Sequence, residues 1–141
     1  AMSQESLKPG EELFTYGKEA EKVYIVDCGC CFYCEGSLPS QNKTDINAGD
    51  WLCEQVLWMP WVHRGQITAG RLCELANIDG VMFREIVAGR PLLRSICSRI
   101  AQRYLAIINE NEINNCCNDL RCCSHETLQN IISTESGSLT D

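Results

Sequence analysis

The fold is decided by residues 66–91, which read QITAGRLCELANIDGVMFREIVAGRP. Within this stretch the spacing of the hydrophobic residues changes. Residues 66–69 and 72–78 have the short, apolar-rich pattern of strands. The residues between Asp79 and Gly89 have a helical pattern, with Asp79 placed to cap the helix and Gly89 placed to end it. The sequence therefore predicts a domain that is mainly β before this point and helical after it.

A second helix is predicted from Pro91, which suits a first helical turn, to about residue 109. Its apolar residues recur every three or four positions and form one stripe. These residues are Leu93, Ile96, Ile100, Tyr104 and Ile107, with Cys97 and Ile108 widening the stripe. Residues 110–141 are rich in Cys, Asn, Ser, Thr and acidic residues, with weak helical potential only around residues 128–132. This composition predicts a polar tail that is disordered or ordered by a partner.

Upstream of residue 66 the chain has short strand patterns separated by glycines. Residues 23–26 form a buried-strand pattern that ends near Gly29, residues 30–34 form another, and residues 35–50 are a polar connection. Strands at this spacing predict a small all-β roll. We therefore expect one domain over residues 1–109, with a β-roll at 7–78 and helices at 80–109, followed by the tail at 110–141.

The charge distribution argues against nucleic acid as a partner. The 141 residues carry a net charge of −7, which leaves no basic surplus to replace counterions on phosphates. Between two acidic flanks, however, residues 81–109 contain five arginines and one acidic residue, Glu85. The arginines are Arg84, Arg90, Arg94, Arg99 and Arg103. This segment favours an anionic ligand or an acidic partner surface, or it is a solvated helix face.

Eleven cysteines are many for this length. The chain opens on a polar stretch rather than a signal peptide, so we expect reduced thiols, a cytoplasmic location and buried cysteines that act as small apolar residues. Zinc is a weaker alternative, at Cys31-x-x-Cys34 or at a group in the tail. The tail group comprises Cys116, Cys117, Cys122, Cys123 and His125. A reactive thiol at Cys53 with His63 as its base is weaker still, because no third orienting group is evident.

A set of short motifs follows in order along the chain. They are Pro9-Gly10-Glu11, Gly17, Tyr24-Ile25, Gly29, Ala48-Gly49-Asp50, Glu54, Cys73-Glu74-Leu75 and Phe83. In this order the chain resembles the cyclic-nucleotide-binding domain family over about residues 6–109, and residues 73–79 look most like its channel and kinase branches. The resemblance implies a double-stranded, jelly-roll-like β-roll. It also implies an excerpt of a larger protein.

Residues 52–65, LCEQVLWMPWVHRG, stand where the family has its phosphate-binding cassette. In the family a Gly-Glu pair opens a one-turn helix whose unpaired N–H groups attract the phosphate, the Glu accepts the ribose 2′-hydroxyl, and an Arg about nine residues later pairs with the phosphate. Here Glu54 takes the place of the ribose acceptor and Cys53 replaces the glycine. The resemblance assigns ligand binding to these residues: Cys53, Glu54, Gln55, Val56, His63 and Arg64.

The phosphate anchor has three alternatives. Counting nine residues from Glu54 gives His63, whereas Arg64 stands one residue further and needs a bulge. If neither serves, the apolar run at residues 56–62 fills or seals the pocket. The same run is otherwise core filling, or places Trp58 or Trp61 over the pocket or against a neighbouring domain.

Two functions are compatible with these motifs. The first is a cytosolic regulatory domain that senses cAMP or cGMP, with the helix at residues 91–109 closing over the base and transmitting binding to an effector domain in the same parent chain, an ion channel or a kinase. The alternative is a ligand-free homology domain that acts as an interaction module. We expect no enzyme, no metal or other cofactor, no nucleic acid and no direct membrane insertion, whereas an oligomer is compatible with either function.

The pH dependence of affinity for cAMP and cGMP separates the three anchors. With Arg64 as anchor, affinity is equal at about pH 6 and pH 8, because guanidinium stays protonated. With His63 as anchor, binding is tighter at about pH 6, where an imidazole carries more charge. We expect weak or absent binding that Arg64→Ala removes. Tight, pH-independent binding that survives Arg64→Ala would contradict this reading of the cassette.

Overall fold

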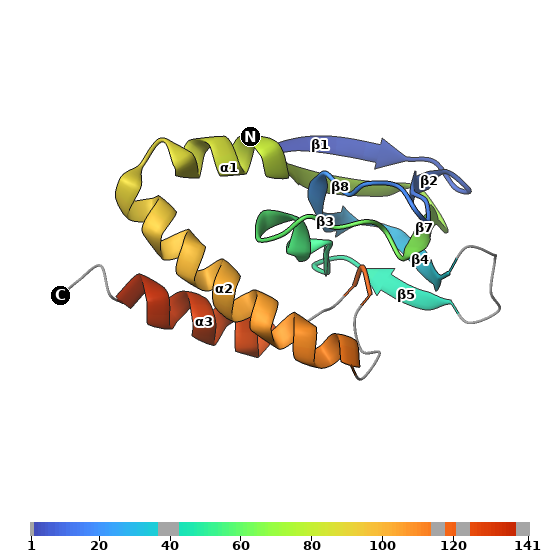
Figure 1. Cartoon of the computed structure of the whole chain (residues 1–141). Helices are drawn as coiled ribbons and strands as arrows, with labels where there is room; N and C mark the ends of the chain where they lie inside the picture. The colour runs from blue at the N-terminus through green and yellow to red at the C-terminus, as the bar shows by residue number, and fades with distance from the viewer. Residues whose placement is uncertain (1, 37–42, 114–117, 121–124, 138–141) are drawn as a thin grey trace.

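The computed structural model describes residues 2–36, 43–113, 118–120 and 125–137 (Figure 1). The strands are β1 (Met2–Leu7), β2 (Glu12–Phe14), β3 (Lys22–Cys28), β4 (Cys30–Glu35), β5 (Thr44–Asn47), β6 (Trp51–Leu52), β7 (Gly65–Ala69) and β8 (Cys73–Asp79). The helices are the short 3-10 helix η1 (Glu54–Leu57) and the α-helices α1 (Gly80–Ala88), α2 (Pro91–Ile113) and α3 (His125–Gly137). The predicted fold class, mainly β with C-terminal helices, is confirmed.

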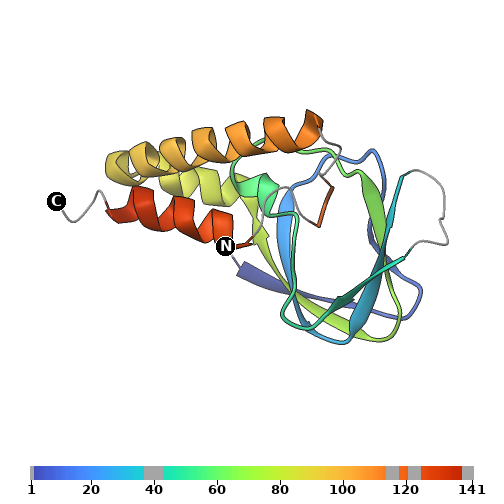
Figure 2. The ribbon, with the colours of Figure 1, turned by 90° about the horizontal axis from the view of Figure 1, so that it is seen from below.

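The strands form two antiparallel sheets of four strands each, in the orders β1-β8-β3-β6 and β2-β7-β4-β5. The sheets curve around a common core, and the helices lie at one end of this roll (Figure 2). Side chains from both sheets meet in that core, among them Val23 and Leu75 from the first sheet and Tyr33 and Ile67 from the second. The predicted β-roll is therefore confirmed.

The chain crosses from one sheet to the other at Gly29. This glycine has a φ of +90°, and a Cβ built on it would lie 2.2 Å from the carbonyl oxygen of Leu72. Leu72 precedes β8, at the point where the chain returns to the first sheet. Only glycine allows the two crossings to lie against each other in this way.

The first strand was not predicted. Residues Met2–Leu7 pair along their whole length with β8, with Met2 opposite Ile78 and Leu7 opposite Cys73. Polar side chains support the pairing, because the Ser3 hydroxyl donates to Asn77 Oδ1 over 2.7 Å. The roll thus starts at Met2 rather than at residue 7, on an edge strand whose polar sequence gives no strand signal.

The helix signals read from the sequence match the structure. The Asp79 carboxylate caps α1 by accepting from the backbone N–H groups of Val81 and Met82, over 2.9 and 3.1 Å. The α2 stripe is buried at Ile96, Ile100, Tyr104 and Ile108. The helix continues to Ile113, past the predicted end near residue 109. None of the described helices is long and apolar enough to cross a membrane.

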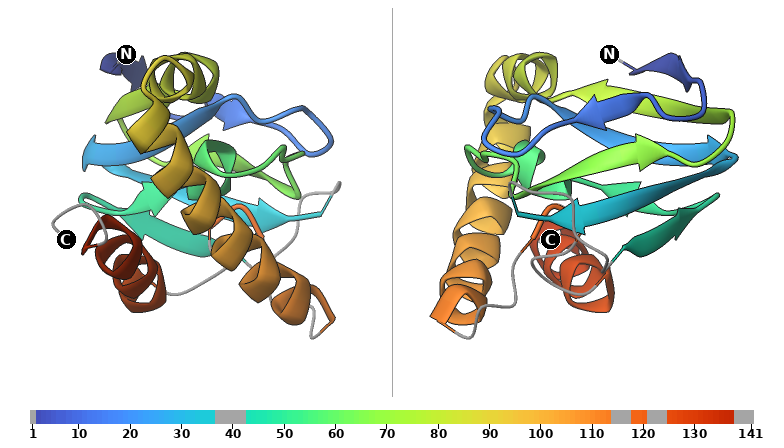
Figure 3. Two further views of the ribbon diagram at one scale, coloured as in Figure 1. Left: turned by 60° about the vertical axis from the view of Figure 1, so that its left-hand side comes forward. Right: turned by 90° about the vertical axis from the view of Figure 1, so that its right-hand side faces the viewer.

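The described part of the tail is ordered by the chain itself rather than disordered or ordered by a partner, and its helix includes residues 128–132, where weak helical potential was predicted. Helix α3 lies beside α2 (Figure 3). Its Ile131, 1% exposed, packs in a cluster with Ile96 and Ile100. Glu135 of α3 accepts from Arg99 over 2.9 Å and lies 3.4 Å from Arg103. The arginine-rich segment was expected to meet an acidic surface. Glu135 on the chain's own last helix is part of that surface.

Replacing Ile131 tests whether α3 is docked. We expect Ile131→Ala to lower the free energy of unfolding by about 2–5 kcal/mol, because it opens a cavity between α2 and α3. Chemical denaturation of the whole chain measures this. The matched control is Ile86→Ala on the exposed face of α1, expected within about 0.5 kcal/mol of the wild type. Equal stability of the two variants would contradict the docking of α3.

Candidate functional site

The segment between η1 and β7 presents alternate side chains to the interior of the roll. Its backbone pairs with residues 17–20, because Trp61 O accepts from Ala20 N over 2.8 Å and His63 N donates to Lys18 O over 2.9 Å. In such extended backbone successive side chains point to opposite sides. Trp61 and His63 are accordingly buried, at 4% and 5% exposed, whereas Val62 between them is 53% exposed.

The two inward side chains meet the carboxylate of Asp119, a residue of the tail that is 0% exposed. Trp61 Nε1 donates to Asp119 Oδ1 over 2.8 Å, and His63 Nδ1 lies 2.9 Å from the same oxygen. The Tyr33 hydroxyl of β4 donates to Oδ2 over 2.7 Å, and the backbone N–H of Arg64 donates to Oδ2 over 2.8 Å. Each carboxylate oxygen thus has two partners.

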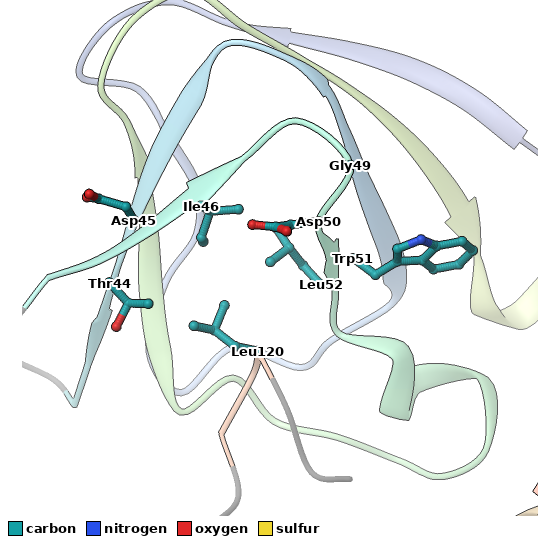
Figure 4. A pocket seen from close by; sticks show the side chains of 8 residues that line it. All are labelled: Thr44, Asp45, Ile46, Gly49, Asp50, Trp51, Leu52 and Leu120. Atoms are coloured by element: carbon teal, nitrogen blue, oxygen red, sulfur yellow. The ribbon is translucent and has the colours of Figure 1, made fainter. Parts of the chain in front are cut away.

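The backbone around Asp119 is held by the cassette region as well. The carbonyl of Asp119 accepts from the N–H of Cys53 over 2.9 Å, and the carbonyl of Asn118 accepts from Gln55 Nε2 over 2.7 Å. Leu120 packs against the hydrophobic core and, together with Ile46, lines a pocket of about 350 Å³ (Figure 4). Residues 118–120, which we call the inserted segment, are therefore held by polar contacts on one side and an apolar contact on the other.

The donor and acceptor roles follow from this geometry. A carboxylate accepts hydrogen bonds, and the tautomer of His63 that fits the contact is the one whose Nδ1–H points at Asp119 Oδ1. Burial, followed by the neighbouring Asp119 carboxylate, raises the pKa of the Tyr33 hydroxyl, which therefore stays protonated and remains a donor. The site is a set of donors arranged for one buried anion. An anion placed there without such donors would carry a large desolvation cost.

The predicted ligand residues of the cassette all lie at this end of the roll. Glu54, Gln55 and Val56 belong to η1 and are buried, and Cys53 precedes them with a left-handed backbone, φ 62° and ψ 34°. A residue other than glycine rarely adopts this conformation. Of this group, the Cys53 backbone and the Gln55 side chain contact the inserted segment, as described above.

Glu54 faces a different cavity. Together with apolar side chains from the cassette, β8 and α3, it lines a pocket of about 360 Å³. The other lining residues are Trp51, Leu57, Trp58, Ile78, Leu128, Gln129 and Ile132. Glu54, predicted to accept a ribose, therefore lines a pocket that α3 also lines, and Asp119 is not among the residues that line it.

Both candidates for the phosphate anchor contact the Asp119 carboxylate in this structure. His63 contacts Asp119 through its ring nitrogen, whereas Arg64 does so through its backbone N–H. The Arg64 guanidinium lies over the Trp61 ring, 4.5 Å from its centroid. The role of these residues toward a nucleotide phosphate stays a prediction.

The structure supplies the third group that a Cys53–His63 pair lacked, but in an arrangement unsuited to nucleophilic catalysis. Cys53 Sγ lies 3.9 Å from His63 Nδ1, the same nitrogen that contacts Asp119. In a catalytic triad the nucleophile and the orienting acid use opposite ring nitrogens. The thiol is also 0% exposed. A substrate has no access to it in this conformation.

The other cysteine groups are not supported as zinc sites. Cys31, 0% exposed, is a core residue of β4, and burial, followed by the neighbouring Cys73, raises the pKa of its thiol to about 12. Since zinc binds the thiolate, this thiol is a poor ligand. Cys116, Cys117, Cys122 and Cys123, with the side chain of His125, lie outside the described residues.

Two residues of the site, Tyr33 and Asp119, were missed by reading the sequence, because Tyr33 had been read as a strand position and Asp119 as part of a polar tail. Trp61 had been read either as core filling or as a side chain over the pocket. Tyr33 and Trp61 lie 86 and 58 residues from Asp119 along the chain. No local pattern encodes such contacts.

Comparison with known proteins gives similarity at the level of structure. No family model matches the chain, and no curated protein matches its sequence. The N-terminal domain of a transcriptional regulator from Streptomyces coelicolor A3(2) superposes with a TM-score of 0.61 at 21% identity, covering 79% of this chain and 79% of that one. A cyclic nucleotide-binding-like protein from Brucella abortus gives 0.54 at 22% identity, covering 62% of this chain and 76% of that one.

Channel structures match as well. The C-linker and CNBHD of zELK channels, crystallised in the presence of cAMP, superpose with a TM-score of 0.57 at 17% identity, covering 72% of this chain and 52% of that one. The chain therefore spans about half the length of this channel fragment. At such identities the similarity concerns the fold, and it agrees with the motifs read from the sequence. The chain has the β-roll fold of cyclic-nucleotide-binding domains.

Proposed function

We propose that this chain is a regulatory domain of the cyclic-nucleotide-binding type whose anion site is occupied by its own inserted segment. The observation that carries the proposal is the buried Asp119 carboxylate with its contacts to Tyr33, Trp61, His63 and the Arg64 backbone. A carboxylate so placed uses the donors that a phosphate would need. The domain therefore acts without a diffusible ligand, as an interaction module whose state depends on whether the segment is seated.

The position of the inserted segment supports a regulatory role. It lies between α2 and α3, so its seating restrains both helices. It also holds η1 through Gln55, and η1 in turn accepts a hydrogen bond at the Val56 carbonyl from Arg84 of α1 over 2.7 Å. Release of the segment would therefore loosen η1 and all three helices together. This is the element through which the domain would pass its state to an attached effector.

Sensing of cAMP or cGMP is the second candidate. It is supported by the donors around Asp119, because a phosphate could bind the same donors once the segment is released. A cyclic phosphate and the Asp119 carboxylate cannot occupy the same donors at once. Nucleotide binding would therefore require release of the segment, and its apparent affinity would fall by the fraction of molecules in the released state. A nucleotide would change the state of the helices only if it bound the released form more tightly than the seated form.

The parent chain and location are proposals as well. The matched channel fragment joins a CNBHD to a C-linker, which supports an effector in the same chain, an ion channel or otherwise a kinase. We place such a domain in the cytoplasm, where its reduced cysteines would persist. An oligomer through the effector is compatible with this arrangement.

Removing the charge of Asp119 tests how strongly the segment is held. We expect Asp119→Asn to lower the free energy of unfolding by about 2–3 kcal/mol, because hydrogen bonds to a charged acceptor are lost and one amide hydrogen faces another donor. Urea denaturation measures this. Asp45→Asn, at an exposed position of β5, is the matched control, expected within about 0.5 kcal/mol of the wild type. Equal changes in the free energy of unfolding for the two variants would contradict the proposed role of Asp119.

Calorimetric titration with cAMP and cGMP separates the two candidate functions. We expect no measurable binding to the wild type, since the segment occupies the donors. If nucleotide competes with the segment, Asp119→Ala should raise affinity at least about tenfold. Adding Glu54→Ala to that variant should then weaken binding by about 1.5–3 kcal/mol, the cost of a lost hydrogen bond to a charged group. Absence of binding in Asp119→Ala leaves the ligand-free module as the function, whereas tight binding to the wild type would contradict the proposal.

A further inference from the structure

Three side chains with metal-binding atoms converge at the inserted segment. Cys53 Sγ, His63 Nδ1 and a carboxylate oxygen of Asp119 all lie within 4.8 Å of one another, and all three residues are buried. Among the described residues no other group of three or more such side chains comes together in this way. The residues come from three separate stretches of chain. Their convergence is therefore a product of the fold and not of a local sequence motif.

The donor atoms have nearly the spacing of a tetrahedral zinc site. Ligand atoms around zinc lie about 3.3–3.6 Å apart, given bonds of about 2.0–2.3 Å. Here Cys53 Sγ is 3.9 Å from His63 Nδ1, and that nitrogen is 2.9 Å from Asp119 Oδ1. These two separations differ from that spacing by about half an ångström, and the third, between Cys53 Sγ and the Asp119 carboxylate oxygen, is within 4.8 Å. A water completes the tetrahedron, because the second carboxylate oxygen already accepts from the Tyr33 hydroxyl and the Arg64 N–H.

The charges also suit a divalent cation. One thiolate and one carboxylate balance Zn²⁺, and a neutral imidazole adds no charge, so the loaded site has no net charge in a buried position. A thiolate ligand favours zinc over magnesium or calcium, which prefer oxygen. The carboxylate is already oriented by Trp61, Tyr33 and the Arg64 backbone, which is the kind of support that metal ligands have in proteins.

Cys53 is placed in this group at a backbone cost. Its φ of 62° is the single positive value among the described residues other than glycine. Glycine would adopt this conformation without strain, whereas another residue costs of order 1 kcal/mol. The side chain gained at this cost is the thiol that faces His63.

We propose that Cys53, His63 and Asp119 bind a zinc ion that joins the roll to the inserted segment. When the ion binds, the Cys53 thiol releases one proton to solvent and the His63 ring changes tautomer, so that its proton stands on Nε2 and Nδ1 is free to ligate; no oxidant or reductant is needed. Two ligands belong to the roll and one to the segment, so zinc stabilises the seated state over the released state. The inference rests on the proposed function, because it supplies the regulation of that same site.

The experiment measures zinc binding to the whole chain after replacement of Cys116, Cys117, Cys122 and Cys123 by serine, which removes competing thiols. Competition against a chromophoric chelator should give one tight equivalent of zinc. Cys53→Gly should weaken it at least tenfold, and glycine suits the left-handed backbone, so misfolding does not explain the loss. Cys97→Ser, on α2, is the matched control and should bind zinc like its parent.

Cobalt gives an independent readout of the ligands. Co²⁺ should produce the visible bands of a tetrahedral ion and a thiolate charge-transfer band, and Cys53→Gly should lose the charge-transfer band. Zinc should raise the midpoint of thermal unfolding of the parent but not of Cys53→Gly.

Either no zinc uptake or equal uptake by Cys53→Gly and its parent overturns the inference. The proposed function is tested separately by Asp119→Asn in buffer with a chelator. A loss of stability there, without any metal, keeps the seated segment while the zinc inference fails.

Discussion

The arrangement of the C-terminal half depends on one buried charge. Asp119 has no exposed surface, so its carboxylate is stable only where several donors reach it. Those donors stand on β4 and on the segment before β7, in the interior of the roll. Once Asp119 is seated, the end of α2 and the start of α3 are both tied to the roll within a few residues. The helices then pack where apolar stripes meet, through Ile96, Ile100 and Ile131.

The fold could be predicted because its signals are local. The change of period around Asp79, the cap itself and the α2 stripe each follow from neighbouring residues, and the structure has them in place. The first strand was missed, and the last helix was predicted only as weak helical potential at residues 128–132, for the same reason: each depends on a partner element. The first strand is a polar edge strand defined by its pairing with β8. The last helix, α3, is a polar segment whose few apolar residues, such as Ile131, matter only because α2 faces them.

The candidate site was predicted in part. Family spacing brought His63 and Arg64 to attention, and both contact the buried anion, one by its ring and the other by its backbone. Which atom of Arg64 makes the contact could not be read from a count of residues, since it depends on the stacking of its guanidinium on Trp61. The anion itself could not be found, because an aspartate in a polar tail differs from its neighbours only once the chain has folded.

The distance along the chain between the donors and their anion has a consequence for synthesis. Arg64 and Asp119 are 55 residues apart. At ribosomal rates of about 5–20 residues per second, the donors emerge roughly 3–11 s before the residue that fills their site. During that interval the roll can form with its anion site open to solvent and to small anions of the cell. The nascent domain therefore passes through a state that the finished chain reaches only by releasing its segment.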